Sequence, residues 1–251
     1  MRVRSTVLGL VVCVTCGAAV AAFQPQAGSK TWLGKHAEIE QFIKTAKTVG
    51  EETIKVGVTK PQRVLLAPGG PVAAVAFSRV HGRHLGYWDS YKADIAAYEV
   101  DKLLQLDMVP PVVEVRYRDE LGRASMWVDN VRMWDVKEQV VAPDQLAFQR
   151  QVVRMKMFDN FIGNTDRNAG NLLLDPAYNL ILIDHTRAFT AGDKLVTKLT
   201  RVDRELWQRM LAITEAQLKD AIGKWVMGSQ IRDVIKRRNR MAAEILTLPT
   251  T

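Results

Sequence analysis

Cysteine is almost absent from this chain. The two cysteines, Cys13 and Cys16, both lie within the first 22 residues, a segment that we expect to be removed. A mature chain without cysteine cannot form a disulfide, so its stability must come from a buried apolar core. With 251 residues, of which 47% are hydrophobic, the chain is long enough to build such a core in one two-lobed domain.

Long hydrophobic runs are also lacking. The most apolar stretch begins at Val7, shortly after two arginines, and reaches Ala22. At about 16 apolar residues it is shorter than the roughly 20 that a membrane-spanning helix needs. A basic start, a short apolar run and the small residues Ala19 and Ala21 are typical of a secretory signal peptide. We therefore expect residues 1–22 to be a signal peptide and the protein to be exported (periplasmic or secreted), with an uncleaved membrane anchor as the alternative.

Acidic residues are too few to balance the basic ones, and the net charge is +8. Loss of Arg2 and Arg4 with the signal peptide would lower the 35 basic residues to 33 and the net charge to +6. A basic run in a predicted C-terminal helix either faces solvent, which we favour, or makes weak contact with an anionic membrane surface. No aromatic residues interleave with it, so nucleic-acid binding is not expected. The run comprises Lys236, Arg237, Arg238 and Arg240.

Motifs of several common enzyme classes are missing. No G-x-S-x-G sequence is present, which gives no support to a hydrolase with a nucleophile elbow. No G-x-G-x-x-G loop is present, so the glycine-rich phosphate flap of protein kinases is absent. His81 and His84 lie close together but lack further ligands at zinc spacing.

The most informative stretch, residues 159–189, is predicted to contain a β-hairpin. Leu172–Leu174 and residues 180–183 are apolar, and the residues between them include Asp, Pro and Asn, which favour turns. A hairpin sets its ends side by side, because cross-strand neighbours lie about 4.5–5.5 Å apart at Cβ. We therefore expect Asn171, just before the first strand, and Asp184, just after the second, to face one another and to share a cation.

Asp166 completes a recognisable spacing, because it lies five positions before Asn171. In protein kinases the same step separates the Asp that orients the acceptor hydroxyl from an Asn that holds Mg²⁺. Mg²⁺ takes oxygen ligands and keeps several waters, so one amide, one carboxylate and the substrate phosphates suffice. We predict Asp166 as the base or hydroxyl orienter, Asn171 and Asp184 as ligands of Mg²⁺ or Mn²⁺, and Arg167 as a residue that stabilises the loop or a phosphate. The alternative is a surface hairpin rich in turn residues.

These residues support a family resemblance. Residues 163–167 with Asn171, followed by Ile183-Asp184, resemble the catalytic and metal loops of the atypical protein-kinase-like superfamily. That group includes phosphatidylinositol 3- and 4-kinases, HipA-type kinases and the secretory-pathway Golgi casein kinase family, and the last of these is the most similar. Its further matches are Phe158-Asp159, Arg187 and Phe189.

A second block of residues also matches the Golgi casein kinase family. Residues 93–98, leading to Val109-Pro110-Pro111, resemble the helix and Val-Pro-Pro segment of its N-terminal lobe. The resemblance covers about residues 56–189 and implies a kinase-like fold, ATP and a divalent metal, without specifying the acceptor. Golgi-type relatives are usually braced by disulfides, so a chain without them is expected to be a bacterial-type exported relative.

The strand that carries a phosphate-binding lysine in related kinases has none here. The resemblance places Ser78 at the lysine position, and Arg79 follows it. We predict that a β-bulge turns Arg79 toward the nucleotide and that it pairs with Asp94, where relatives have Glu. Lys60 is a further candidate for contact with phosphates. The alternative is a degenerate site, as in a pseudokinase.

Periodicity predicts the remaining elements. Strands are expected at residues 54–59, 63–66, 72–77, 112–117 and 124–131, with a turn at 119–122. Helices are expected at 33–49, 94–106, 144–161 with Asp144 as N-cap, 204–213, 215–225 and 229–246. Among single residues, we expect adenine to dock near Asp129, and His185 to be a loop histidine or a partner behind the metal ligand.

The sequence thus predicts an α+β, protein-kinase-like fold of two lobes. Residues 23–49 form a helical extension, 50–131 an N-lobe with a small antiparallel sheet, and 132–251 a mainly helical C-lobe. The predicted function is ATP-dependent phosphoryl transfer to a hydroxyl of a protein, a lipid headgroup or a sugar. The alternative is an exported nucleotide-binding pseudokinase or interaction module without catalysis.

Overall fold

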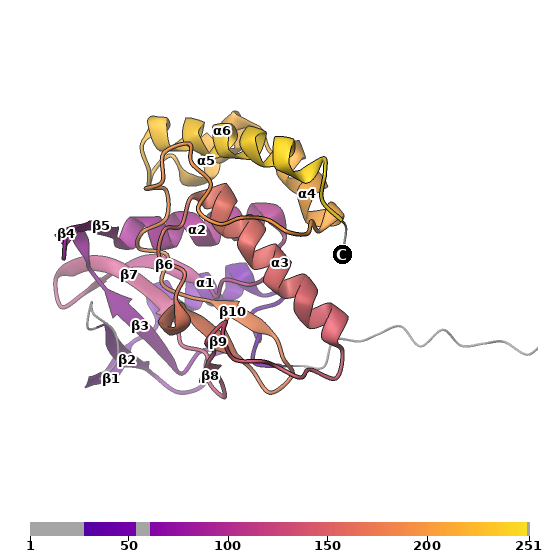
Figure 1. Cartoon of the computed structure of the whole chain (residues 1–251). Coiled ribbons are helices and arrows are strands. Elements are labelled where there is room, and N and C mark those ends of the chain that lie inside the picture. Colours follow the sequence, from indigo (N-terminus) through magenta and orange to yellow (C-terminus); the bar gives the residue numbers. More distant parts are fainter. Residues whose placement is uncertain (1–27, 54–60, 250–251) are drawn as a thin grey trace, which may run out of the picture.

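The structure is a computed structural model that describes residues 28–53 and 61–249. Its smaller lobe is built on a five-stranded antiparallel sheet with the strand order β1-β2-β3-β7-β6 (Figure 1). The strands predicted at residues 63–66, 72–77 and 112–117 are confirmed as β2, β3 and β6. The strand predicted at 54–59 lies outside the described residues. The strands of the sheet are β1 (Thr48–Thr53), β2 (Gln62–Leu66), β3 (Ala74–Ser78), β6 (Val112–Tyr117) and β7 (Glu120–Met126).

The turn between β6 and β7 is tighter than predicted. Arg118 and Asp119 both have positive φ, at 49° and 63°, and Tyr117 pairs directly with Glu120. Two central residues with positive φ make the turn whose twist suits a hairpin. The prediction of a turn over residues 119–122 is therefore wrong, and β7 begins four residues before the expected position 124. This extension brings Arg123 into the strand.

Helices α1 (His36–Thr45) and α2 (Tyr91–Leu104) both pack against this sheet. Successive residues of a strand point to opposite faces, and β6 shows the result. Val113 joins the cluster that contains Ile39 of α1, whereas Val112 joins the cluster that contains Ile95 of α2. The sheet is thus covered by one helix on each face, and α2 is the helix that faces the second lobe (Figure 1).

Helix α2 begins at Tyr91, three residues earlier than predicted, and is buried along most of its length. It ends at Leu104, and the left-handed conformation of the next residue, Gln105, closes the last turn. The carboxylate of Asp101 accepts the backbone N–H groups of Asp107, Met108 and Val109, each at 3.1 Å. These contacts fix the turn that leads into β6.

The second lobe is mainly helical, and its predicted helices are confirmed. The carboxylate of Asp144 accepts the N–H of Ala147 at 2.9 Å and so caps α3 as expected. A small sheet with the order β10-β9-β8 lies beside α3. The elements of this lobe are α3 (Gln145–Ile162), α4 (Arg204–Ala212), α5 (Glu215–Ile222), α6 (Gly228–Ile245), β8 (Arg132–Met133), β9 (Leu172–Leu174), β10 (Leu180–Leu182) and the 3₁₀ turn η1 (Ala169–Asn171). A separate hairpin, β4 (His81–His84) with β5 (Tyr87–Ser90), lies between β3 and α2 in the chain.

The basic run of α6 is largely engaged within the protein. Arg237 is fully buried, and its Nε donates to the backbone oxygen of Phe161 at 3.1 Å. Arg238 donates to the backbone oxygen of Ile213 at 2.6 Å, and Arg240 pairs with Asp193. Arg237 therefore does not face solvent, and the favoured prediction of a solvent-facing basic run is wrong for this residue. In the described part of the chain, no helix is both long and apolar enough to cross a membrane.

Candidate active site

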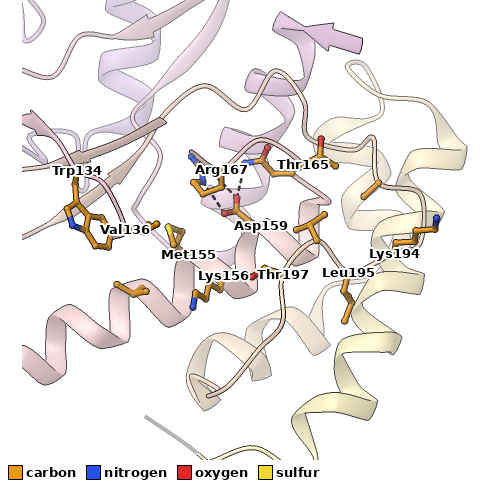
Figure 2. Close-up of a pocket in the computed structure, with 14 residues that line it drawn as sticks. Trp134, Val136, Met155, Lys156, Asp159, Thr165, Arg167, Lys194, Leu195 and Thr197 are labelled. Carbon is orange, nitrogen blue, oxygen red and sulfur yellow. Dashed lines mark hydrogen bonds and ion pairs between the residues drawn. The ribbon is translucent and has the colours of Figure 1, made fainter. Parts of the chain in front are cut away.

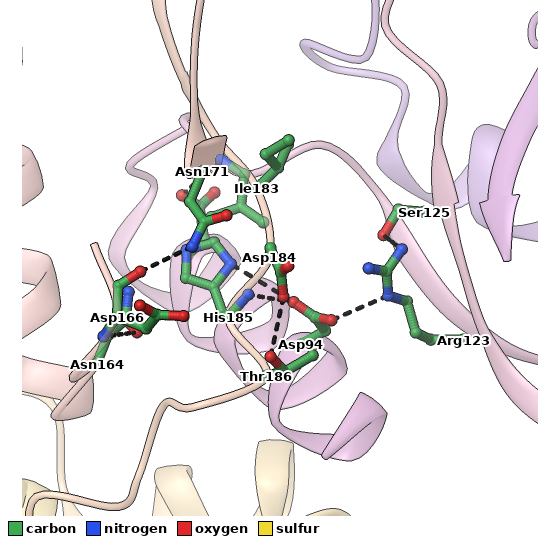
Figure 3. Close-up of polar contacts among 12 residues, drawn as sticks. Asp94, Arg123, Ser125, Asn164, Asp166, Asn171, Ile183, Asp184, His185 and Thr186 are labelled. Atoms are coloured by element: carbon green, nitrogen blue, oxygen red, sulfur yellow. Dashed lines mark hydrogen bonds and ion pairs between the residues drawn. The ribbon is translucent and has the colours of Figure 1, made fainter. Parts of the chain in front are cut away.

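The predicted hairpin is confirmed, and its register places the two metal-ligand candidates at one end. Leu172 pairs with Leu182, and the N–H of Ile183 donates to the backbone oxygen of Asn171 at 3.2 Å. Asn171 therefore lies opposite Ile183, and Asp184 follows one residue later, so the two candidates are not direct cross-strand partners as expected. The chain turns at Asp184, whose φ is +53°. The side chains of Asp184 and Asn171, both drawn in Figure 3, line the same cavity.

This cavity has a volume of about 410 Å³ and is lined by residues of both lobes. Part of its lining is apolar, from the ends of the large sheet and from the hairpin. The rest is polar, from the loops around Asp166 and Asp184. A cavity of this kind suits a ligand with an apolar ring and a charged group. The apolar lining includes Ala76, Met126, Val128, Val131, Met133, Leu173 and Ile183, and the polar lining includes Asp89, Arg123, Asp166, Asn171, Asp184 and Arg187.

Asn171 and Asp184, the two candidate metal ligands, each have one side-chain oxygen without a described hydrogen bond. The side-chain amide nitrogen of Asn171 donates to the backbone oxygen of Asp166 at 2.7 Å. Its amide oxygen has no described hydrogen bond. The Oδ1 of Asp184 accepts from the Thr186 hydroxyl at 2.9 Å, and no described donor contacts its Oδ2. One amide oxygen and one carboxylate oxygen are a donor set that fits Mg²⁺ or Mn²⁺ with waters and phosphates completing the shell. The described residues contain no cluster of three or more His, Cys, Asp or Glu that could hold a metal, at His81–His84 or elsewhere.

Asp166 lies in the same cavity and remains partly accessible, with 33% of its side chain exposed. Its Oδ2 pairs with Nη1 of Arg187 at 3.3 Å, and Arg187 also donates through Nε to Asp89 at 2.9 Å. The amide oxygen of Asn164 accepts the backbone N–H of Asp166 at 3.3 Å. The contact with Arg187 orients the Asp166 carboxylate, and the contact with Asn164 holds its backbone, while the carboxylate stays within reach of a ligand in the cavity.

Arg167 supports the hairpin and does not line the cavity that contains Asp166. Its Nη1 donates to the backbone oxygens of Asn171 at 2.8 Å and of Ile183 at 3.1 Å, which are the two ends of the hairpin. Its Nε and Nη2 bind both carboxylate oxygens of Asp159, at 3.0 and 2.9 Å. Of the two predicted roles for Arg167, the geometry supports stabilisation of the loop, because every guanidinium nitrogen is already engaged by the protein.

The predicted pair between Arg79 and Asp94 does not form. Arg79 follows β3 with 63% of its side chain exposed, and it pairs with Glu120 at the surface. The pairing of β3 with β7 runs without a shift from Val75 to Ser78, so the bulge that Arg79 required is absent. The buried Asp94 instead accepts a hydrogen bond from Nε of Arg123 at 2.9 Å (Figure 3).

Sequence reasoning missed Arg123 because it assigned residues 119–122 to a turn. With the tighter turn, Arg123 becomes the direct cross-strand partner of Ser78, the position assigned to the missing lysine. Cross-strand partners project from the same face of a sheet. The two-residue turn carries Arg and Asp instead of the common Asn-Gly or Asp-Gly, so the sequence held little signal for it.

Asp94 also contacts the loop that follows the hairpin. The backbone N–H of His185 donates to its Oδ1, and the His185 ring packs edge-on against Phe158. Burial lowers the pKa of His185 well below its ordinary value, and the charges of Arg167 and Arg123 act in the same direction. Burial raises the pKa of Asp94 to about 6, although Arg123 opposes this shift. His185 is therefore a neutral, buried partner behind Asp184, and of its two predicted roles that of a plain loop histidine is wrong. Lys60, the last predicted contact, lies outside the described residues.

A second cavity, of about 760 Å³, borders the loop that carries Asp166, through Thr165 and Arg167 (Figure 2). Successive residues of this loop line different cavities: Thr165 and Arg167 line the second, whereas Asp166 and Asn168 line the first. The floor comes from α3 and the segment 191–197. Its lining includes the apolar residues Trp134, Val136, Val152, Met155 and Leu195 and the lysines Lys156 and Lys194.

The fold is similar to that of solved atypical kinases. A Golgi casein kinase with Mn and ADP bound matches with a TM-score of 0.61 and 12% identity, over 84% of this chain and 75% of that chain. The structure of hydra Fam20 with sugar matches with a TM-score of 0.63 and 13% identity, over 84% and 88%. The Helicobacter pylori proinflammatory kinase CtkA matches with a TM-score of 0.51 and 10% identity, over 81% and 94%. No protein-family model and no curated protein matches the sequence. The predicted atypical kinase-like fold, close to Fam20, is confirmed.

Proposed function

We propose that this chain is a metal-dependent phosphotransferase that moves the γ-phosphoryl group of ATP to a hydroxyl group. The observation that carries the proposal is the meeting of Asp166, Asn171 and Asp184 at one cavity between the lobes of a kinase-like fold. The spacing of these residues along the chain is that of a kinase catalytic loop and metal loop. A surface hairpin would not need to bring the three side chains to one cavity.

Each side chain has a role that its contacts support. Asp166, whose carboxylate pairs with Arg187 and whose backbone N–H donates to Asn164, accepts or orients the proton of the acceptor hydroxyl. Asn171 and Asp184 hold Mg²⁺ or Mn²⁺, which when bound would neutralise charge on the phosphate oxygens. The apolar lining around Met126 and Val128 receives the adenine ring, close to the predicted docking position at Asp129.

The acceptor is proposed to place its hydroxyl in the first cavity, next to Asp166, while the rest of the acceptor lies against the second cavity, which shares the Asp166 loop as a wall. Its one lining carboxylate, Asp159, is bound at both oxygens by Arg167. Lys156 and Lys194 have no described ion pair. These charges favour an acceptor that carries negative charge as well as a hydroxyl, whether protein, lipid headgroup or sugar derivative. Lys156→Ala should raise the KM for the acceptor and leave the KM for ATP unchanged.

Transfer of label from γ-labelled ATP to a panel of protein, lipid and sugar acceptors tests the proposal. We expect transfer that needs Mg²⁺ or Mn²⁺ and that Asp166→Ala abolishes. Asp220→Ala is the matched control, because Asp220 is exposed on α5, away from the cavity. Transfer that persists in Asp166→Ala would overturn the catalytic role. Binding of ATP without transfer to any acceptor would instead favour the nucleotide-binding pseudokinase.

Export of the mature protein is also proposed, since the first 22 residues have the pattern of a signal peptide. Intact mass and N-terminal sequencing of the natural product test this proposal. We expect an N-terminus near Ala22 or Phe23 in the exported fraction. A full-length chain that remains with the membrane would indicate the uncleaved anchor.

A further inference from the structure

We propose that Arg123 binds the phosphate groups of the nucleotide from β7, in place of the lysine that related kinases carry on the strand equivalent to β3. The inference rests on the proposed function, because it assigns a contact for the nucleotide in the same cavity. It names a residue that no sequence motif identifies, and it moves the phosphate contact to a different strand.

The position of Arg123 is the first argument. Arg123 pairs directly with Ser78 across β3 and β7. Because the two side chains project from the same face, an arginine on β7 reaches the region that a lysine at position 78 would reach. Arg123 and its neighbour Ser125 both line the nucleotide cavity, together with Asn171 and Asp184 of the metal loop. The cation thus lies at the cavity that is proposed to hold the metal and the phosphates.

The hydrogen bonds of the guanidinium group are the second argument. Nε donates to Asp94 at 2.9 Å, and Nη1 donates to the backbone oxygen of Ala76 at 2.9 Å and to the Ser125 hydroxyl at 3.0 Å. No described acceptor contacts Nη2. Three partners therefore fix the plane of the group and leave one nitrogen for a ligand. A pre-oriented arginine binds phosphate oxygens well because little side-chain freedom is lost on binding.

The charge balance of the cavity is the third argument. Two arginines line it within the described residues. Arg187 is shared between the carboxylates of Asp89 and Asp166. Arg123 has one carboxylate partner, Asp94, and Asp94 also accepts the N–H of His185. Arg123 thus pairs with one carboxylate and Arg187 with two. The positive charge of Arg123 is less neutralised, so Arg123 is better placed to bind the negatively charged phosphates of a nucleotide.

The competing interpretation is purely structural, with Arg123 serving only to hold α2 against the sheet. The two interpretations differ in which ligands they affect. A phosphate contact contributes to the binding of ATP and not to that of adenosine. Loss of a structural contact that shapes the whole cavity weakens the binding of both ligands and lowers the free energy of unfolding.

The test measures the Kd of ATP with Mg²⁺ and the Kd of adenosine, by calorimetry, for wild type, Arg123→Met and the matched control Arg118→Met. Arg118 is an exposed arginine of the same sheet lobe, paired with Glu51. We expect Arg123→Met to weaken ATP binding about 10- to 100-fold, the usual range for a lost hydrogen bond to a charged group. Adenosine binding should change by less than about threefold, and Arg118→Met should change neither.

A rescue variant tests the geometry. In the Arg123→Met background, Ser78→Lys places a cation on β3 at the facing position and should recover part of the lost ATP affinity. If Arg123→Met does not fold, Arg123→Gln gives the same comparison, because it keeps a donor for Asp94 and removes the charge. Equal ATP affinity in wild type and in the folded variant, or parallel losses for ATP and adenosine, would overturn the inference. Failure of wild type itself to bind ATP would overturn the proposed function instead.

Discussion

Nε of Arg123 lies 2.9 Å from Oδ2 of Asp94, and both side chains are almost fully buried. The pair joins β7 to α2, and the backbone N–H of His185, which donates to the same carboxylate, joins α2 to the loop that carries Asp184. The sheet, the helix and the loop that carries Asp184 are therefore connected through one acidic side chain. This connection holds the sheet of the smaller lobe in a fixed relation to the proposed metal site.

Replacing Arg79, the arginine that the sequence predicted to contact the nucleotide, should have little effect on stability or on ATP binding. Arg79 pairs with Glu120, and both side chains are largely exposed. We expect Arg79→Ala to cost no more than about 1 kcal/mol in the free energy of unfolding and to leave the Kd of ATP unchanged. A calorimetric titration checks this, and a marked loss of ATP affinity would return Arg79 to the nucleotide site.

Gly163, which ends α3 just before the loop that carries Asp166, should not tolerate a side chain. Its φ is +63°, and a Cβ there would lie 2.7 Å from Cζ of the buried Arg237. Gly192 has a similar φ of +60° but open space around it. We expect Gly192→Ala to cost about 1–2 kcal/mol for the backbone conformation, and Gly163→Ala to cost about 1–3 kcal/mol more from the clash. Chemical denaturation of both variants measures the difference, and equal costs would contradict the contact with Arg237.

The ion pair beneath the hairpin should contribute far more than a similar pair at the surface. Arg167 binds Asp159 through two nitrogens in a buried site, whereas Arg132 binds Glu138 through two nitrogens with both side chains exposed. Arg167→Met leaves a buried carboxylate without its partner, and we expect a loss of about 3–5 kcal/mol in the free energy of unfolding. Arg132→Met should cost at most about 1 kcal/mol. Similar losses in the two variants would contradict this account of the loop.

The pH dependence of stability should report the burial of Asp94. Burial raises the pKa of Asp94 to about 6 in the folded protein, against the effect of Arg123, while an unfolded chain has an Asp pKa of about 3.9. Between these values the folded state binds more protons, so this group makes the protein more stable as the pH falls from about 6 to about 4, by at most about 1.4 kcal/mol per pH unit. Asp94→Asn lacks this response. Urea denaturation of both proteins should therefore show a difference that changes with pH, and a constant difference would contradict the raised pKa.

The hairpin and the helical lobe could be predicted from the sequence because their signals are local. Turn residues between two short apolar runs define β9 and β10, and Asp144 caps α3 where expected. The placement of Asn171 and Asp184 at one cavity follows from this local geometry, although the exact pairing was off by one residue.

The partner of Asp94 could not be predicted in the same way, because it depends on a pairing between distant parts of the chain. Arg123 meets Ser78 across two strands that are separated by more than 40 residues. An error of a few residues in one turn was enough to assign the wrong arginine. Arg167 illustrates a second limit, since the three residues that accept its four hydrogen bonds come from α3 and from both ends of the hairpin. No spacing rule distinguishes such a support from a phosphate contact.

The most direct test of the central claim is the metal dependence of ATP binding in wild type and in Asp184→Ala, measured by calorimetry and by the shift in Tm. If Asn171 and Asp184 hold Mg²⁺ or Mn²⁺ against the phosphates, ATP should bind wild type tightly and raise its Tm only when the divalent ion is present. Asp184→Ala should lose both the metal requirement and most of the Tm shift. Equal binding of ATP to both proteins, with and without a divalent ion, would contradict the claim that this cavity is a metal-dependent nucleotide site.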